Sequence, residues 1–164
     1  MTATGKTLVT SALPYVNATK HLGNLAGSLL PADVHARRLR QEGREVLFVC
    51  GTDEHGTPAE ISAARAGLSP SEFCAREHAR HAETYRRFGL SFDHFGRTSS
   101  ARNRELTRHV FRKLDERGFV GEGTVRLAWS STDGRYLPDR YVEGECPHCG
   151  GKARGDQCEA CSRP

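Results

Sequence analysis

Two Cys-x-x-Cys motifs near the end of this 164-residue chain constrain its structure more than any other feature. They supply Cys146, Cys149, Cys158 and Cys161. Two such pairs can place four thiolates at the corners of a tetrahedron, the coordination that Zn²⁺ prefers. Four thiolates leave no open position on the metal, so we expect a structural zinc site; disulfides or free thiols are the alternative. His148 lies between two of these ligands and is expected to be a surface residue rather than a fifth ligand.

Before the cysteine motifs, hydrophobic periodicity predicts alternating strands and helices. The expected strands cover residues 7–12, 45–50 and 91–95, and the expected helices cover residues 22–43, 57–67, 69–89 and 100–117. This alternation is typical of an α/β protein with a parallel sheet. From residue 119 the pattern changes to short strands and turns. We therefore expect an α/β part over residues 1–118 and a smaller part, ending in the cysteine motifs, over residues 119–164.

Local signals refine three of these helices. Pro31 lies inside the first and is expected to kink or break it, because proline lacks an N–H and crowds the preceding turn. Two four-residue segments, Thr57-Pro58-Ala59-Glu60 and Ser69-Pro70-Ser71-Glu72, have the form of a capping box with proline at the first helical position. We expect Thr57 and Ser69 to be the capping residues of the second and third helices.

The segment His21-Leu22-Gly23-Asn24 opens the first helix, directly after the first strand. At that place the unpaired N–H groups and the helix dipole favour an anion such as a triphosphate. A histidine can donate to a phosphate oxygen, and Gly23 lets a ligand approach the backbone closely. No Gly-x-Gly-x-x-Gly motif follows the strand, which argues against a dinucleotide-binding oxidoreductase.

Polar residues also follow the second strand, in the segment from Gly51 to Thr57. Ligands of open α/β sheets bind at the carboxyl ends of the strands. Carboxylates there, such as Asp53, could hold an ammonium group or a ribose hydroxyl. An acidic loop that merely leads into the next helix is an equally good interpretation of these residues alone.

The formal net charge of +4 is compatible with a polyanionic partner but does not require one. Basic residues are densest between residues 97 and 117, where we favour a solvated helix face over contact with RNA. The first twenty residues lack the pattern of a secretory signal, and no apolar run is long enough to cross a bilayer. We expect a cytoplasmic protein with no membrane partner.

Together these segments resemble a known family. Residues 12–17, Ala-Leu-Pro-Tyr-Val-Asn, followed by His21-Leu22-Gly23-Asn24, resemble the first signature of class I aminoacyl-tRNA synthetases in its methionine-specific form. Residues 48–57 resemble the second-strand motif of the methionyl-tRNA synthetases, and residues 136–144 with the cysteine motifs resemble their inserted zinc region. Asn24 stands where the class signature often has a second histidine, and residues 18–20 differ from the commoner forms of this loop.

The resemblance implies a fold, a reaction and a set of roles. The fold is the first half of a Rossmann-like parallel-sheet catalytic domain over residues 1–118, and residues 119–164 begin a connective insertion with a zinc knuckle. The reaction is the ATP-dependent activation of methionine and its transfer to tRNA, with Mg²⁺ accompanying ATP. The residues implied to bind ATP are His21, Gly23 and Asn24, with His21 and Asn24 also catalytic. Those implied to bind methionine are Leu13, Tyr15 and Asp53, and the four cysteines would hold the zinc.

The resemblance also implies parts that this sequence does not contain. The family carries a Lys-Met-Ser-Lys-Ser loop that supplies cationic groups to the transferring phosphate, whereas Met1 is the only methionine here. A helical domain that reads the anticodon is also absent. We therefore expect the chain to be inactive alone, and its first strand to form an unprotected sheet edge that favours self-association.

Two other functions remain open at this stage. The chain could be a non-catalytic, zinc-containing nucleotide- or RNA-binding module derived from the synthetase. It could also be a generic zinc-knuckle RNA-binding protein, although that interpretation leaves the motifs around His21 and Asp53 unexplained.

Overall fold

The computed structural model describes residues 5–17, 21–138, 141–154, 158 and 160–163. The chain divides into two compact units, Met1–Lys113 and Leu114–Pro164, here called the N-terminal and C-terminal units. The predicted catalytic domain over residues 1–118 and the predicted insertion over residues 119–164 are functional assignments, and they stay predictions.

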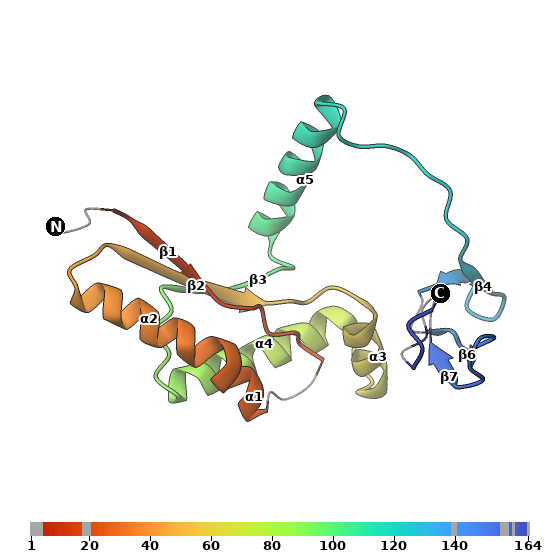
Figure 1. Ribbon diagram of the computed structural model, residues 1–164, viewed down its shortest axis with the longest axis horizontal. Coiled ribbons are helices and arrows are strands. Elements are labelled where there is room, and N and C mark those ends of the chain that lie inside the picture. The colour runs from red at the N-terminus through yellow and green to blue at the C-terminus, as the bar shows by residue number, and fades with distance from the viewer. Residues whose placement is uncertain (1–4, 18–20, 139–140, 155–157, 159, 164) are drawn as a thin grey trace. The chain divides into compact units, whose positions relative to one another are not determined.

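The N-terminal unit is built on a three-stranded parallel sheet in the order β1-β2-β3 (Figure 1). Its strands are β1 (Thr7–Thr10), β2 (Val46–Thr52) and β3 (His94–Arg97). Its helical segments are α1 (Leu22–Asn24), the π-helical η1 (Leu25–Leu29), α2 (Leu30–Gln41), α3 (Thr57–Arg65), α4 (Pro70–Arg87) and most of α5 (Ala101–Glu116). The α/β class with a parallel sheet is confirmed, and β1 lies at one edge of the sheet, as expected.

One face of the sheet carries the core. Val9 of β1 lies beside Phe48 of β2 in the sheet register, and both are buried against Ala36 and Leu39 of α2. Figure 1 shows α2 and α4 together on this side of the sheet. The next registered pair, Leu8 and Leu47, points the other way, because side chains alternate along a strand. These two leucines are 62% and 52% exposed.

The first long helix is interrupted, but by a wider turn and not a sharp break. The turn before Pro31 is the π-helix η1, in which the N–H of Leu30 donates to the carbonyl of Leu25. Pro31 itself lies in the first turn of α2. A proline donates no hydrogen bond and its ring crowds the carbonyl four residues earlier, and a wider turn accommodates both effects.

The third strand begins three residues later than predicted. Ser91 donates its N–H and its hydroxyl to Asp33 Oδ1 of α2, at 2.5 and 2.6 Å. Asp93 Oδ2 accepts from Arg40 of α2, at 2.7 Å, and from the N–H of Phe48, at 2.6 Å. The polar residues before β3 therefore bind α2 and the end of the sheet, so the ladder with β2 starts only at His94.

The two capping boxes have different outcomes. Ser69 is confirmed: its hydroxyl accepts from the N–H of Glu72, whose carboxylate accepts from the N–H of Ser69. The capping box at Thr57 is wrong, because α3 starts at Thr57 and its N-cap is Gly56, which makes no side-chain cap. Gly56 has φ +113°, and a Cβ there would lie 2.8 Å from the hydroxyl of Tyr15. Contact with Tyr15 thus explains why a glycine precedes this helix.

The C-terminal unit contains two antiparallel hairpins. One joins β4 (Ala128–Ser130) to β5 (Arg135–Leu137), and the other joins β6 (Glu143–Glu145) to β7 (Lys152–Arg154). Trp129 and Tyr136 pack edge to face across the first hairpin, with ring centroids 4.9 Å apart. The first pair of cysteines, Cys146 and Cys149, lies in the loop of the second hairpin.

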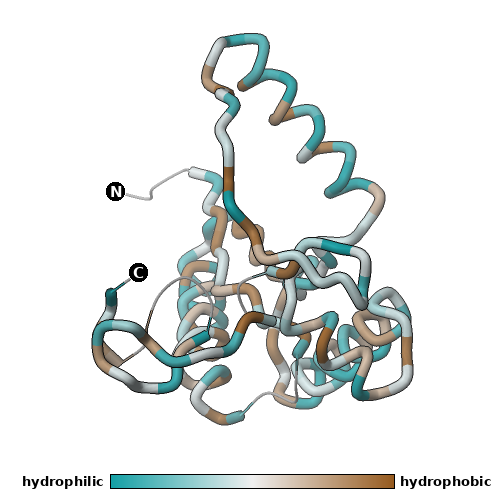
Figure 2. The backbone as a smooth tube through the Cα atoms, turned by 90° about the vertical axis from the view of Figure 1, so that its right-hand side faces the viewer, coloured by the Kyte–Doolittle hydropathy of each residue, from teal (hydrophilic) through white to brown (hydrophobic). Residues whose placement is uncertain are grey.

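The helix α5 is one residue shorter at each end than the predicted range of residues 100–117. Its apolar side chains, Leu106, Val110, Phe111 and Leu114, are all substantially exposed. Figure 2 shows that hydrophilic residues dominate this helix and that hydrophobic ones recur along it. Nowhere in the described residues is there a helix with the length and apolar character needed to cross a membrane.

Candidate functional site

The segments around Tyr15 and Asp53, far apart in the sequence, lie side by side where β1 and β2 end. Tyr15 and Asp53 form a parallel bridge. The N–H of Val16 donates to the carbonyl of Asp53 at 3.1 Å, and the N–H of Asp53 donates to the carbonyl of Pro14 at 3.0 Å. The Tyr15 hydroxyl donates to the carbonyl of His55 at 2.7 Å. The first two motifs therefore form one backbone-paired structure.

His21 caps the helix that opens the first motif. Its Nδ1 accepts from the N–H of Gly23 at 3.0 Å. Because Nδ1 is an acceptor here, the proton of the neutral ring is on Nε2, which stays available as a donor. A Cβ at residue 23 would lie 2.8 Å from the His21 ring, so glycine at this position lets the ring fold over the helix start.

A groove of about 660 Å³ runs along these segments. It is lined by Ala12, Leu13, Pro14, Tyr15, Asn17, His21, Gly23, Asn24, Gly27, Ser28 and Leu29. The structure thus gathers five of the residues implied by the resemblance along one groove, and Asp53 joins them through its bridge to Tyr15. The unusual residues 18–20 lie outside the described part of the chain. The functional roles of these residues stay predictions.

The sequence analysis missed a polar cluster around Glu54, the residue that follows Asp53. The Glu54 carboxylate accepts from the Thr52 hydroxyl at 2.8 Å, from Nε of Arg97 at 2.8 Å, and from the Ser99 hydroxyl. Burial raises the pKa of Glu54, but the hydrogen bonds from Arg97, Ser99 and Thr52 outweigh it and hold that pKa below its ordinary value of 4.5. Polar residues at the carboxyl ends of two neighbouring strands were the available signal.

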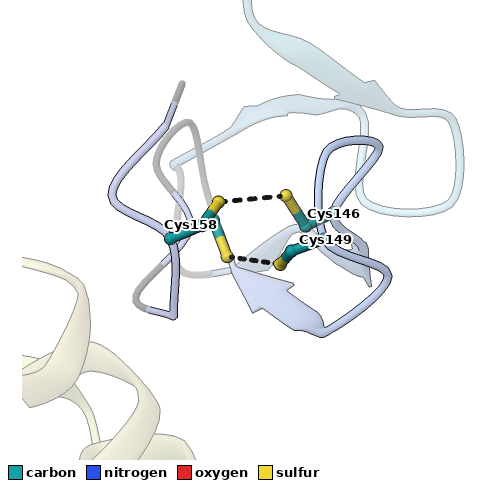
Figure 3. A group of neighbouring side chains, drawn as sticks. Cys146, Cys149 and Cys158 are labelled. Carbon is teal, nitrogen blue, oxygen red and sulfur yellow. Dashed lines mark hydrogen bonds between the residues drawn. The ribbon is translucent and has the colours of Figure 1, made fainter.

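The four cysteines of the C-terminal unit converge (Figure 3). Their sulfur atoms all lie within 4.8 Å of one another. Two sulfur–sulfur distances, between Cys146 and Cys161 and between Cys149 and Cys158, are both 3.7 Å. A disulfide bond is about 2.05 Å long, whereas a tetrahedron of sulfurs about 2.3 Å from a central Zn²⁺ has edges of about 3.8 Å. All four thiols are free, and the cluster can hold a metal ion.

Each cysteine pair is presented by the same kind of turn. In the first, the N–H of Gly150 donates to the carbonyl of Cys146; in the second, the N–H of Ser162 donates to the carbonyl of Cys158. Both bonds are 2.8 Å long. Gly150 and Ser162 occupy equivalent places and have φ values of +69° and +56°. Ser162 is thus a residue with a side chain in a conformation that favours glycine.

Backbone amides favour a thiolate at Cys146, whereas burial and hydrogen bonds with the neighbouring sulfurs raise the pKa of Cys161 to about 12. The N–H groups of His148 and Cys149 hydrogen-bond to the Cys146 sulfur and lower the pKa of that thiol to about 6. A thiolate is the form of cysteine that binds metal. The turn that presents the sulfur therefore also prepares it to bind a metal ion.

Comparison with known proteins agrees with this geometry. Residues 7–164 match the model of the family described as tRNA synthetases class I (M). A methionine–tRNA ligase of Streptomyces avermitilis is 60% identical over 157 residues, which cover 95% of this chain and 27% of that protein. A methionine–tRNA ligase of Jannaschia sp. is 58% identical over 164 residues, which cover 99% of this chain and 29% of that protein.

Solved structures show the same likeness. A Mycobacterium tuberculosis methionyl-tRNA synthetase bound by methionyl-adenylate matches with a TM-score of 0.69 at 25% identity, over 98% of this chain and 30% of that one. The chain thus spans less than a third of the length of these relatives. Family match, identity and fold agree, and the chain belongs to the class I tRNA synthetases, in the methionine–tRNA ligase group.

Proposed function

We propose that this chain contributes the methionine and ATP half-sites of a methionine–tRNA ligase. The observation that carries the proposal is the backbone pairing that brings the Asp53 segment beside Tyr15, which lines one groove with His21. In the proposed reaction, the carboxylate of methionine attacks the α-phosphate of ATP and releases pyrophosphate. The methionyl group then passes from the adenylate to tRNA.

Each residue of the groove receives a role consistent with its chemistry. His21 donates from Nε2 to a phosphate oxygen; Gly23, whose N–H is bonded to His21 Nδ1, leaves room for the ligand, and Asn24 binds ATP beside it. The backbone carbonyl of Leu13 and the carboxylate of Asp53 bind the methionine ammonium group. Tyr15, held by the carbonyl of His55, covers the substrate.

The metals in this proposal have separate tasks. The four cysteines hold a structural Zn²⁺, which is supported by their donor chemistry and their 3.7 Å spacings. A Mg²⁺ ion accompanies ATP as part of the substrate. We place the reaction in the cytoplasm, where tRNA and free thiols are both found.

We further propose that the chain alone activates methionine poorly. No Lys-Met-Ser-Lys-Ser segment is present in its sequence, so cationic donors to the transferring phosphate are missing. Removing one such donor commonly reduces a rate by a factor of about 10² to 10³. A binding module that retains the two half-sites is the second candidate, because the groove and the four-cysteine cluster could each bind a ligand without catalysing a reaction.

Methionine-dependent exchange of pyrophosphate into ATP, measured with the purified chain, tests the proposal. His21→Asn keeps a helix-capping side chain but loses the Nε2 donor. His109→Ala changes an exposed histidine on α5 and is the control. Exchange that His21→Asn abolishes, with the control unaffected, would show activation by this chain unaided.

Binding measurements separate the two candidates. Weak or absent exchange, with ATP and methionine binding that His21→Asn weakens, would support the half-site proposal and the expected low activity. Absence of binding for both ligands by the wild-type chain would contradict both candidates.

A further inference from the structure

The Glu54 carboxylate follows Asp53 directly in the sequence and is deeply buried, with its side chain 0% exposed. Arg97 is its ion-pair partner, with Nε 2.8 Å from one carboxylate oxygen and 3.1 Å from the other. The hydroxyls of Thr52 and Ser99 complete its hydrogen bonds. This carboxylate therefore links the end of β2 to the end of β3 and the residues that follow it.

Backbone hydrogen bonds also join the segment around Glu54 to the residues that follow β3. The N–H of Glu54 donates to the hydroxyl of Thr98 at 2.9 Å, and the N–H of Thr98 donates to the carbonyl of Thr52 at 3.1 Å. The thiol of Cys74, on α4, lies 3.7 Å from the carbonyl of Glu54. Three elements thus hold this short segment.

A hydrogen bond between Thr52 and His78 extends the cluster to α4, and the donor of that bond can be assigned. Thr52 Oγ1 lies 2.8 Å from Glu54 Oε1 and 2.9 Å from Nδ1 of His78. Thr52 has one hydroxyl hydrogen, and an ionised carboxylate only accepts, so Thr52 donates to Glu54. It follows that Nδ1 of His78 carries a hydrogen and donates to Thr52. The stacking of His78 on Phe95, at 5.2 Å between centroids, fixes the ring in place.

The two neighbours of Glu54 in the sequence, Asp53 and His55, both contact Tyr15 of the proposed amino-acid site. Asp53 forms the bridge to Tyr15, and the carbonyl of His55 accepts the Tyr15 hydroxyl. A buried ion pair is not needed for packing, since apolar side chains of similar volume serve as well or better. A complete set of hydrogen bonds on a buried charge does, however, fix one backbone geometry.

We propose that Glu54 is a positioning residue for the amino-acid site: held by Arg97, it fixes the course of residues 52–55 and so places the Asp53 carboxylate for the substrate ammonium group. This inference rests on the proposed function. It adds a residue that does not touch the substrate but determines how selectively the site binds the amino group. Displacement of a binding group by about 1 Å commonly costs a factor of about 10 to 100 in affinity or rate.

The test uses the whole chain and two probes. One is a non-hydrolysable sulfamoyl analogue of methionyl-adenylate, and the other is the same compound without its α-amino group. Calorimetric titration gives the Kd of each probe for the wild type and for Glu54→Gln. Glu83→Gln is the matched control, because it changes an exposed carboxylate of α4 that pairs with Arg86 at 2.8 Å.

We expect Glu54→Gln to weaken binding of the amino probe by about 10- to 100-fold and to leave binding of the des-amino probe within about threefold. Thermal melting identifies a variant that fails to fold; in that case Ser99→Ala, which removes a single hydrogen bond from the same carboxylate, replaces it with the same expected selectivity. Equal loss for both probes, or no loss for either, would overturn the positioning role while leaving the proposed function intact. If the wild-type chain binds neither probe, the proposed function fails and this inference fails with it.

Discussion

The two units of this chain are stabilised by different means. The N-terminal unit has three apolar clusters, in which residues such as Phe48, Ala63 and Leu29 are almost completely buried. In the described part of the C-terminal unit, the only buried residues are Cys146 and Cys158. Its aromatic residues Trp129 and Tyr136 contact each other but are more than half exposed.

The difference indicates that the N-terminal unit folds by the hydrophobic effect, and we expect the C-terminal unit to depend on metal ligation. A segment of about fifty residues that buries so little apolar surface cannot offset the conformational entropy lost on folding. Four converging thiols can do so when they bind a metal, because the binding free energy then contributes to folding. The two units should therefore respond to different perturbations.

Removal of metal should have the largest effect, and it should be confined to the C-terminal unit. Structural zinc contributes an apparent binding free energy of about 10–16 kcal/mol at neutral pH in small zinc domains. Chelation, or Cys149→Ser, should therefore unfold the hairpins β4–β5 and β6–β7. Amide hydrogen exchange measured unit by unit checks this expectation, and Cys74→Ser is the control for loss of a cysteine outside the cluster. Unchanged protection around residues 143–154 after chelation would contradict it.

Truncation of a core side chain should destabilise the N-terminal unit and leave the C-terminal unit unaffected. Phe48→Ala removes a completely buried ring that packs on Phe92 at 4.5 Å between centroids. Truncations of this kind cost about 3–5 kcal/mol. The N-terminal unit should lose most of its stability, while metal binding by the cysteines stays unchanged. Denaturant unfolding with a parallel zinc titration measures both, and weakened zinc binding would show that the units are coupled.

Acidification should affect the two units at different pH values. The folded-state pKa of Glu54 is lowered, so its contribution to stability is complete above its ordinary value of 4.5 and is lost as the pH falls through the folded pKa. The cysteine cluster should release its metal at a higher pH, because metal-bound thiolates become protonated.

On stepwise acidification we therefore expect zinc release before the N-terminal unit unfolds. A chromogenic chelator reports the first event and far-ultraviolet circular dichroism the second. In Glu54→Gln the loss of N-terminal stability below pH 4.5 should be smaller than in the wild type. The reverse order of the two events would contradict the comparison.

The smallest effect concerns one backbone position of the C-terminal unit. Ser162 has φ +56°, and a left-handed conformation costs a residue with a side chain about 1–2 kcal/mol. Ser162→Gly should therefore strengthen metal binding by up to about tenfold, whereas Gly150→Ala, at the equivalent place in the first turn, should weaken it. Competition against a chelator of known affinity measures the metal affinity of both variants. A change of affinity in the same direction for the two variants would rule out this explanation.

Features encoded by neighbouring residues could be predicted from the sequence. The Ser69 capping box needs only Glu72, three residues away, and the cysteine cluster needs two short motifs. The parallel sheet followed from the alternation of periodic segments. These signals are local, and no distant contact overrode them, whereas the contact between Tyr15 and Gly56 overrode the equally local signal at Thr57.

Features that depend on distant contacts could not be predicted. The start of β3 depends on Asp33 and Arg40, more than fifty residues earlier, which bind the residues before the strand. The start of α3 depends on the Tyr15 hydroxyl above Gly56, forty-one residues away in the sequence. The cluster around Glu54 requires two strand ends to be adjacent, and only the folded sheet makes Arg97 its neighbour.

We expect the exposed leucines of the sheet to make the stability of the N-terminal unit dependent on concentration. Leu8 and Leu47 are adjacent and exposed, and burying such a side chain contributes about 1.5–3 kcal/mol. Any binding partner that covers them, including a second copy of the chain, would bind the folded state and not the unfolded one. By mass action, the melting temperature would then rise with the logarithm of the concentration of that partner. The melting temperature of this chain is thus expected to be a property of the solution as well as of the sequence.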